Sequence, residues 1–434
     1  MPESLKSALQ YIRSLGAVAD MEADAARRPS GAGAFRSNTH VHLPPNFSAF
    51  RDASEAVGLA AAQGLWCLGA SNYYDFGVYA AFAAKCRERG IFPLFGVEVI
   101  ALIDDLLRRG VKVNDPGNPG KMYLCGKGIW RLEPLTATAR RLLETIRAND
   151  RTRMAKMIAL MNGIFEKIGV KVALTEDGIV DMVAQRSSSP REAVTLQERH
   201  VSLAFQEAFF EGVPEAERPK TLGAVLGQPF ADAAGDAVKV QGALRTHLMK
   251  ADRPAFVDET FVTFDDALRL ILELGGIPCY PTLADGASPI CAFEEPVERL
   301  IENVRSRNIH CVEFIPARND GRVLRRYVKA MRAAGLVVTA GTEHNTLDLM
   351  PMNPTALGGE PLPADVERVF CEGASVAAAH EFLCLRGECG FVDGRGFPNP
   401  AYAGREELIA HMARLGAAVV RRAAESRKTR TVRE

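Results

Sequence analysis

The sequence predicts an α/β protein built on a mainly parallel β-sheet. Short apolar segments alternate with amphipathic helical segments between residues 35 and 99, and the same alternation returns from residue 263. Strands separated by helices at this spacing form βαβ units, whose strands run parallel. In such sheets the functional groups collect at the carboxyl ends of the strands. Side chains that end each predicted strand are therefore the first candidates for a site.

The composition is that of a folded protein and argues against several functional classes. A chain of 434 residues, 47% hydrophobic and 24% charged, is long enough for one large α/β domain with insertions or for two domains. Lys and Arg number 53, as do Asp and Glu, so no net charge attracts nucleic acid or anionic lipid. No secretory signal and no apolar run of about 18 residues is apparent, and the nine cysteines include no C-x-x-C pair. We therefore expect a cytoplasmic protein with reduced thiols that acts on a small molecule, with neither nucleic acid nor a membrane as partner.

The amino-terminal part begins with a predicted extension, residues 1–34, made of a short helix over 4–16 and a linker or second helix over 17–34. Strands are then expected over 35–43, 64–71 and 91–99, with helices over 54–63 and 78–89 between them. The Pro44-Pro45 pair stops the pairing of the first strand. Five polar residues fall at the carboxyl ends of these strands: His40, His42, Asn72, Tyr73 and Glu98.

The pattern changes over residues 104–255 and resumes afterwards. A turn-rich loop over 114–120 leads to a strand-like segment, 121–125, and then to helices over 136–148, 151–168 and 196–210. This region is expected to be a helical insertion or lid over the mouth of a barrel that spans 35–350. The barrel resumes with helices over 263–274, 294–307 and 321–334 and strands over 275–281, 310–315 and 337–345. Residues 351–434 are expected to form a C-terminal helical extension, with helices over 363–370, 374–385 and 404–425.

Two histidines in the first strand are the starting point for a metal site. His40 and His42 are separated by one residue, so they point to the same side of a strand, where two imidazoles can hold one divalent cation. A His-x-His pair alone is more often a pair of solvent-facing histidines, but acids and histidines at other strand ends add to it. Glu98 closes an apolar strand, and Glu343-His344 follow another. The competing interpretations are a surface glutamate at 98 and a helix-capping acid with a loop histidine at 343–344.

Together, His40, His42, Glu98 and Glu343 make a ligand set of two imidazoles and two carboxylates. Mixed nitrogen and oxygen ligands suit zinc, manganese or iron better than calcium. If Glu98 bridges two ions, His200 could serve the second, although a lone helical histidine is more often structural. Metal bound there would lower the pKa of a bound water and polarise a phosphoryl or carbonyl oxygen.

These residues resemble the motifs of the PHP family, named after polymerase and histidinol phosphatase, from about residue 38 to 345. The family's D-x-H-x-H motif is mirrored by Asn38 through His42, with asparagine in place of aspartate, and its G-h-E motif by Gly96-Val97-Glu98. Three further matches are Arg199-His200-Val201, Leu248-Met249-Lys250 with residues 254–257, and Val312 through Arg318. The resemblance implies a distorted (β/α)7 TIM-like barrel with one to three metals at its C-terminal face. Many members of the family hydrolyse phosphate esters.

The chain departs from the family pattern at three places. Ser71-Asn72-Tyr73-Tyr74 stands where T-D-H-N is expected, Cys279-Tyr280-Pro281 where A-H-P is expected, and Gly341 through Asn345 where G-S-D-x-H is expected. The resemblance implies that the two-imidazole, two-carboxylate set holds the first metal. For a second metal, the bridging carboxylate and His200 remain, with Tyr280 in place of a histidine. A third site would be absent or rebuilt with His344, so the resemblance implies one or two divalent ions.

The sequence therefore favours a metal-dependent hydrolase that acts on a phosphorylated small molecule. The candidate catalytic residues are Glu98, His200, Arg318 and Tyr280. The candidate substrate-binding residues are Asn72, Tyr73, Lys250 and Arg318, the arginine binding an anionic group through its guanidinium fork. Two alternatives remain open. One is hydrolysis, elimination or isomerisation of a non-phosphate substrate such as a sugar acid. The other is a catalytically inactive PHP-like binding protein, which the loss of three usual ligand positions would explain. The sequence leaves the oligomeric state open.

Overall fold

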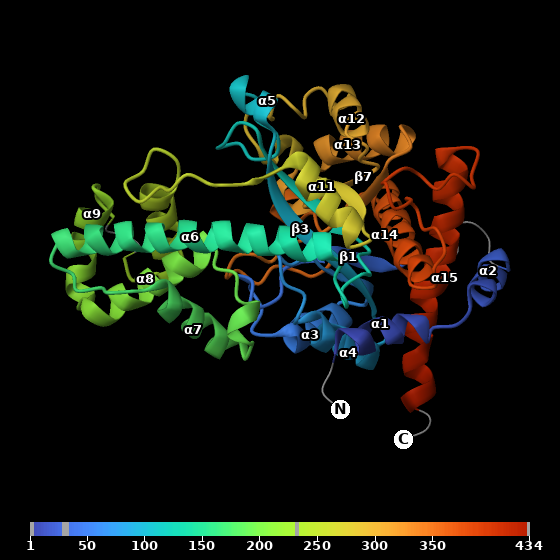
Figure 1. The fold of residues 1–434 in the computed structure, drawn as a ribbon, viewed down its shortest axis with the longest axis horizontal. Helices are drawn as coiled ribbons and strands as arrows, with labels where there is room; N and C mark the ends of the chain where they lie inside the picture. The colour runs from blue at the N-terminus through green and yellow to red at the C-terminus, as the bar shows by residue number, and fades with distance from the viewer. Residues whose placement is uncertain (1–3, 28–33, 231–233, 432–434) are drawn as a thin grey trace. The chain divides into compact units, whose positions relative to one another are not determined.

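The computed structural model describes residues 4–27, 34–230 and 234–431, and these residues form two compact units (Figure 1). The barrel unit comprises the chain up to Leu43, residues 52–143 and the chain from Val262 onward. The helical unit comprises residues 44–51 and 144–261. Parts of the predicted terminal extensions, residues 1–3, 28–33 and 432–434, lie outside the described residues.

The sheet of the barrel unit is a nearly closed barrel, which confirms the predicted fold class. In the described residues its strand order is β1-β2-β3-β4-β6-β7-β8, with the short β5 pairing with β3. The strands are β1 (Arg36–Val41), β2 (Leu65–Ala70), β3 (Phe92–Leu102), β4 (Lys121–Lys127), β5 (Val262–Thr263), β6 (Ile277–Thr282), β7 (Cys311–Phe314) and β8 (Val337–Ala340). Hydrogen bonds from His42 N to Glu343 O (2.8 Å) and from Glu343 N to His40 O (2.9 Å) join the end of β1 to the segment that follows β8.

One strand of the barrel runs against the others. β4 pairs antiparallel with both β3 and β6, whereas the pairs β1–β2, β2–β3, β6–β7 and β7–β8 are parallel. Residues 121–125 were predicted as part of the insertion, but they belong to this barrel strand. The chain returns from β3 to β4 through the short helix α5 (Asp104–Arg108) and the loop that follows it. Its register places Cys125 opposite Glu98 and Lys127 opposite Gly96, two residues deeper in the barrel.

Amphipathic helices cover the barrel. They are α3 (Ala53–Ala62), α4 (Tyr79–Arg89), α11 (Phe264–Glu273), α12 (Val297–Arg305), α13 (Gly321–Ala333), α14 (Ala364–Cys384) and α15 (Arg405–Thr431), with α1 (Leu5–Arg13) and α2 (Val18–Ala26) at the amino terminus. Helix α12 shows the pattern, because it buries Val297, Leu300, Ile301 and Val304 at the helical period.

Helix α14 is continuous, although two helices were predicted over its length. Gly373 interrupts the sequence pattern there, yet it serves as a contact point rather than a break. A Cβ atom on this glycine would lie 2.0 Å from the carbonyl oxygen of Val338 in β8. The glycine therefore lets the helix pack closely against the sheet.

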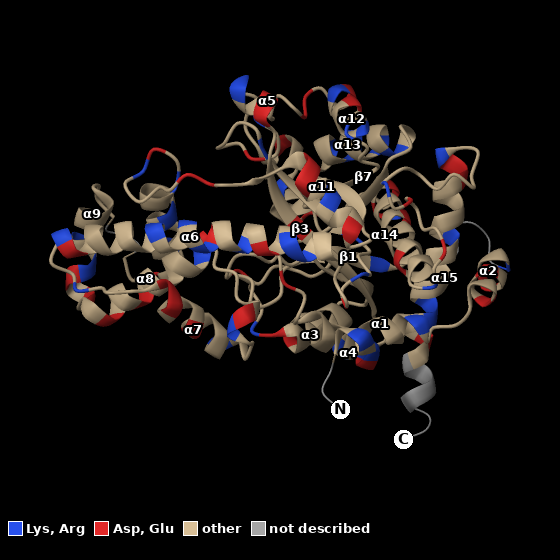
Figure 2. Ribbon diagram, in the orientation of Figure 1, with Lys and Arg blue, Asp and Glu red and all other residues tan. Residues whose placement is uncertain are grey.

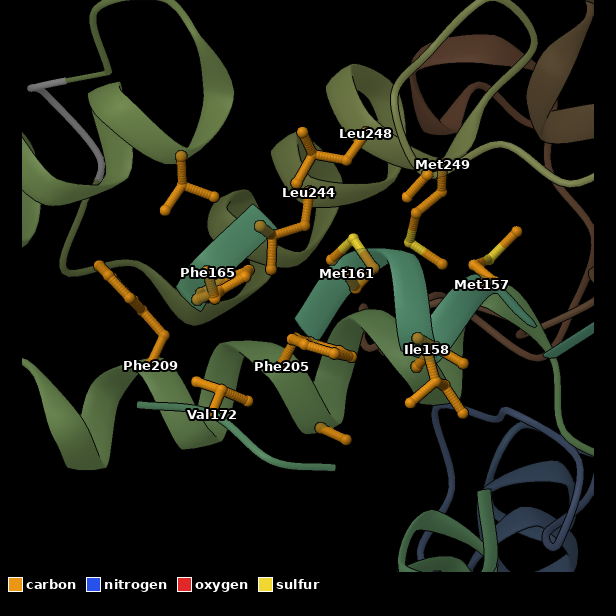
Figure 3. Packing of buried hydrophobic residues seen from close by; sticks show 14 of the residues in the cluster. Met157, Ile158, Met161, Phe165, Val172, Phe205, Phe209, Leu244, Leu248 and Met249 are labelled. Atoms are coloured by element: carbon orange, nitrogen blue, oxygen red, sulfur yellow. The ribbon is translucent and has the colours of Figure 1, made fainter. Parts of the chain in front are cut away.

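The helical unit is built from α7 (Glu176–Ser187), α8 (Glu198–Gly212), α9 (Arg218–Leu226), α10 (Ala237–Leu244) and the second half of α6 (Ala137–Lys167). Two helices, over 136–148 and 151–168, were predicted where α6 is one; no proline or glycine lies at residues 149–150, and the helix continues through them. Figure 3 shows Met161, Phe165, Phe205 and Phe209 packed at the centre of the unit's hydrophobic cluster.

Acidic and basic residues are interspersed along the helices of both units (Figure 2), as their equal numbers in the sequence suggest. None of the helices in the described part of the chain is both long enough and apolar enough to cross a membrane.

Candidate metal centre

The two histidines of the His-x-His pair converge at the end of β1. Both rings are buried, and their Nε2 atoms lie 3.3 Å apart. The pairing of β1 with β2 is irregular between Asn38 and Val41, so the strand is distorted where it carries these side chains. Asn38 holds the distorted segment: its Oδ1 accepts from the backbone of His40, and its Nδ2 donates to Thr342 Oγ1 and Met352 O.

Glu98 completes a group of three metal-capable side chains. Its Oε2 atom lies 3.0 Å from His42 Nε2 and 3.7 Å from His40 Nε2. Four ligands at about 2.0–2.1 Å from a zinc ion would lie about 3.4 Å from one another, so the three spacings match the edges of a coordination shell. Among the described residues, no donor is aligned well enough with Glu98 Oε2 to form a hydrogen bond. The buried lone pair and the two imidazole nitrogens thus fit a cation.

The electrostatics of this group also favour a cation. Burial alone would raise the pKa of Glu98, but the neighbouring imidazoles of His40 and His42 hold it well below its ordinary value. Burial would lower the pKa of His40, but the carboxylate of Glu313 more than offsets this and holds it well above its ordinary value. Glu98 therefore stays ionised while His40 holds a proton tightly, and a metal ion would compete with that proton for the imidazole.

Sequence reasoning assigned no role to Glu313 or Lys127, which lie directly behind His40. Glu313 Oε2 is 2.7 Å from His40 Nδ1, and Glu313 Oε1 is 2.6 Å from Lys127 Nζ. Both side chains are fully buried. A signal for Glu313 exists in the sequence, because it is a charged residue within the otherwise apolar β7, and a buried charge needs a partner. β4 carries two lysines, so its sequence does not single out Lys127.

The structure pairs the fourth predicted ligand, Glu343, with an arginine. Arg318 faces its carboxylate in a two-pronged ion pair, with one contact of 3.0 Å between Nη1 and Oε1 and a second between Nη2 and Oε2. Asn345 Nδ2 donates to the same carboxylate at 2.7 Å. The Glu343 backbone is in the left-handed region, with φ of 59°, and hydrogen-bonds to the end of β1. Its backbone therefore lies beside the histidines, while its side chain is held by Arg318.

His344 and Tyr280 bind to neighbouring loops. The buried His344 ring has Nδ1 2.8 Å from Thr342 Oγ1 and Nε2 2.9 Å from Met350 O, and burial lowers its pKa. Tyr280 is fully buried and donates to Glu294 Oε1 at 2.8 Å. In this arrangement both side chains support the rim of the barrel.

Asn72 and Tyr73, predicted to bind substrate, lie next to the histidine pair. Asn72 makes two hydrogen bonds of 2.8 Å with the backbone of Leu43, which fixes the chain just beyond His42. The ring of Tyr73 stacks on His42, with centroids 5.0 Å apart and planes inclined by 13°. Tyr73 therefore covers one face of the His42 imidazole, a candidate metal ligand.

His200 and Lys250 belong to the helical unit. His200 Nδ1 accepts from the backbone of Gln197 at the start of α8, and burial lowers its pKa to about 3, so the ring is neutral. Lys250 Nζ donates to Glu198 at 2.7 Å, and Arg153 binds the other oxygen of that carboxylate. That His200 shares a second ion with the barrel unit stays a prediction, as does substrate binding by Lys250.

Comparison with known proteins finds similarity in structure only. No protein-family model matches the sequence, and no curated protein does. The chain is similar to the structure of an amidohydrolase from Chromobacterium violaceum with bound sulfate and no metal: the TM-score is 0.48 and the identity 18%, over 77% of this chain and 96% of that one. It is also similar to a candidate metal-dependent phosphoesterase from Bifidobacterium adolescentis, with a TM-score of 0.48 and 17% identity over 79% of this chain and 97% of that one.

Proposed function

We propose that the protein is a metal-dependent hydrolase that cleaves a phosphate ester of a small molecule. The observation that carries this proposal is the convergence of His40 Nε2, His42 Nε2 and Glu98 Oε2, with mutual distances of 3.0–3.7 Å, at the carboxyl end of a barrel. These three side chains would hold a divalent ion, for which zinc, manganese and iron are the candidates. When bound, such an ion acidifies a water molecule and polarises the bond to be cleaved.

Two residues of the protein, Glu98 and Arg318, would contribute charge and substrate binding. Glu98 stays ionised at neutral pH because its pKa is held far below its ordinary value. Arg318 is the cation available to a substrate anion, since 40% of its side chain is exposed, whereas Lys127 is sealed inside the barrel. A guanidinium binds a phosphoryl group through two parallel hydrogen bonds. The guanidinium of Arg318 is paired with the carboxylate of Glu343. A bound phosphate would take the place of that carboxylate on Arg318 and release the Glu343 side chain.

The pairing of Arg318 with Glu343 also supports a second candidate. If the carboxylate keeps the guanidinium, the site presents Glu98, Glu343 and a metal ion, which favours a less anionic substrate. The enzyme would then hydrolyse, eliminate or isomerise a compound such as a sugar acid. In both cases the substrate is a small molecule, and we propose that the protein acts in the cytoplasm without nucleic acid or a membrane.

The proposal is tested by removing and restoring the metal. Protein stripped with a chelator and verified by elemental analysis is supplied with zinc, manganese or ferrous iron and assayed for phosphate release from a panel of sugar phosphates and nucleotides. We expect metal-dependent release. R318M should lower kcat/KM by about 10–100-fold, the worth of a charged hydrogen bond, without changing metal content. R322M removes an arginine that is 96% exposed on α13 and should leave kcat/KM within about 2-fold, as a matched control.

Other results would redirect the assignment. Stoichiometric metal without phosphate release across the panel contradicts the phosphoesterase. Cleavage of lactones, N-acyl compounds or sugar acids by the same protein establishes the second candidate. A chain that binds none of the three metals is a binding protein with this fold and not a metal-dependent hydrolase.

A further inference from the structure

A lysine is sealed inside the barrel beside the candidate metal centre. Lys127, at the end of β4, is fully buried. Its ammonium group lies 2.6 Å from Glu313 Oε1 and donates to the carbonyl oxygen of Thr39 at 3.0 Å. Removing an ammonium ion from water costs several kcal/mol, so its partners must be well placed to retain it.

Glu313 links this lysine to a candidate metal ligand. While Oε1 faces Lys127 and accepts from Thr39 Oγ1 at 2.8 Å, Oε2 lies 2.7 Å from His40 Nδ1. Residues 39 and 40 would normally point to opposite sides of a strand. The irregular pairing of β1 at this point lets both reach the same carboxylate. Three strands, β4, β7 and β1, thus converge on one hydrogen-bonded chain.

We propose that Lys127 and Glu313 are positioning residues that aim His40 at the metal. The Nδ1–H group of His40 donates a hydrogen bond to Glu313 Oε2. The lone pair of the imidazole is then on Nε2, which faces His42 and Glu98. Lys127 holds the other carboxylate oxygen, so Glu313 cannot turn away from the imidazole. This inference rests on the proposed function, and it adds residues that lie behind the ligands and touch no metal themselves.

A purely structural role is a poor explanation for this pair. Apolar residues of similar volume frequently replace a buried ion pair with no loss of stability, so stability alone gives little reason to keep one. A second metal at the same place is also disfavoured. Cys125 Sγ lies 4.0 Å from His40 Nδ1 and completes a possible ligand group with Glu313, but a cation there would have to displace the ammonium group of Lys127 from Glu313.

The test compares two variants with a matched control. E313Q removes the charge that orients His40, and the double variant K127M/E313Q removes the whole pair without leaving a buried charge. E381Q makes the same chemical change at another fully buried glutamate of the barrel unit, on α14, where the carboxylate accepts from the backbone of Phe95. Dissociation constants for Zn²⁺ and Co²⁺ are measured by competition with a chelator, and folding is followed by circular dichroism of the metal-free proteins.

We expect E313Q and the double variant to weaken metal binding by about 10–100-fold, and E381Q to leave it within about 2-fold. A second readout needs no metal. In ¹H–¹⁵N spectra of the histidine ring nitrogens, the hydrogen-bonded Nδ1 proton of His40 should be visible in the parent and in E381Q and shifted or lost in E313Q.

The outcomes separate this inference from the proposed function. If the parent binds no metal, the hydrolase fails, and the ring-nitrogen spectra still decide whether Glu313 fixes the imidazole. If folded E313Q binds metal as tightly as the parent, the positioning role is overturned while the hydrolase stands. If E313Q and the double variant both fail to fold although E381Q folds, the pair is needed for folding and the positioning role is likewise overturned.

Discussion

The interiors of the two units differ in kind. The helical unit is filled by an apolar cluster in which methionines and phenylalanines from α6 and α8 interlock (Figure 3). The barrel unit also has an apolar core, but among its strands it buries a chain of ionisable groups, Lys127, Glu313, His40 and Glu98.

The difference shows which interior serves folding and which serves chemistry. Apolar burial lowers the free energy of the folded state roughly in proportion to the area removed from water. Burying charges has the opposite effect unless each finds a partner, and even then the net gain is small. A barrel that collects four such groups in one place gives up stability, which a binding site for a cation would explain. Substitutions at the buried ionisable groups should therefore lower metal affinity. Substitutions in the apolar cluster should instead lower the free energy of unfolding.

The largest effect is expected from removing both histidines. H40A/H42A deletes two of the three candidate ligands, which leaves a single carboxylate and should abolish stoichiometric metal binding. Elemental analysis and calorimetric titration with Zn²⁺ measure the loss. H411A, which removes a histidine of α15 far along the chain from the cluster, is the control. Unchanged metal content in the double variant would mean that the metal binds elsewhere. The buried ionisable groups of the barrel unit would then not be explained by metal binding.

The converse experiment truncates the core of the helical unit. Phe205 is fully buried in that cluster, and F205A should lower the free energy of unfolding by about 3–5 kcal/mol through lost burial and the cavity left behind. Urea denaturation measures the change. The affinity for Zn²⁺ should stay within about 2-fold of the parent. L160A, at a leucine of α6 that is 43% exposed, should cost far less. A loss of metal affinity in folded F205A would mean that the two interiors are not separable.

A buried carboxyl group in the barrel unit, that of Glu294, makes a contribution to stability that depends on pH. Burial raises the pKa of Glu294 to about 7, although hydrogen bonds from Leu283, Tyr280 and Ala284 oppose the rise. A carboxyl whose folded pKa is raised contributes its stability below the unfolded value, about 4.5, and loses it as the pH rises through about 7. The contribution of Glu294 to stability should therefore fall by about 3 kcal/mol between pH 4.5 and pH 8, and it is measured as the difference in unfolding free energy between the parent and E294Q.

Denaturation curves of the parent and E294Q at pH 5, 6, 7 and 8 measure this difference, which should shrink as the pH rises. F205A, which alters the other unit, should shift the whole curve downward and keep its slope. A difference between the parent and E294Q that stays constant over this range would show that the hydrogen bonds outweigh burial and keep Glu294 ionised.

The sequence alone predicts the barrel and much of the histidine cluster. Alternating strands and helices identify the parallel units, and the spacing of His40 and His42 follows directly from the two-residue period of a strand. Glu98 was placed near them by the rule that strand ends meet at one edge of the sheet, although β3 continues beyond it to Leu102. These features depend on local periodicity, which a single chain displays.

Pairings between distant segments could not be predicted in the same way. Nothing local indicates that β4 runs antiparallel between β3 and β6, so Lys127 could not be placed beside Glu313. The pairing of Glu343 with Arg318 depends on a left-handed turn after β8, where a continued strand was expected. Long-range partners are set by tertiary packing, and sequence periodicity carries little information about them.

The smallest effect should be the same in both units, because it is local. Helix α7 of the helical unit begins with Thr175 Oγ1 accepting from Gly178 N at 3.1 Å, and α11 of the barrel unit begins with Thr263 Oγ1 accepting from Asp266 N at 3.1 Å. T175A and T263A each remove one such cap and should each lower the free energy of unfolding by about 1 kcal/mol. Urea denaturation and Zn²⁺ titration check both. Equal losses of unfolding free energy, with unchanged metal affinity, would show that helix caps contribute alike in the two units. The difference between the units would then lie in their buried groups. A much larger cost at either cap, or a change in affinity, would contradict this.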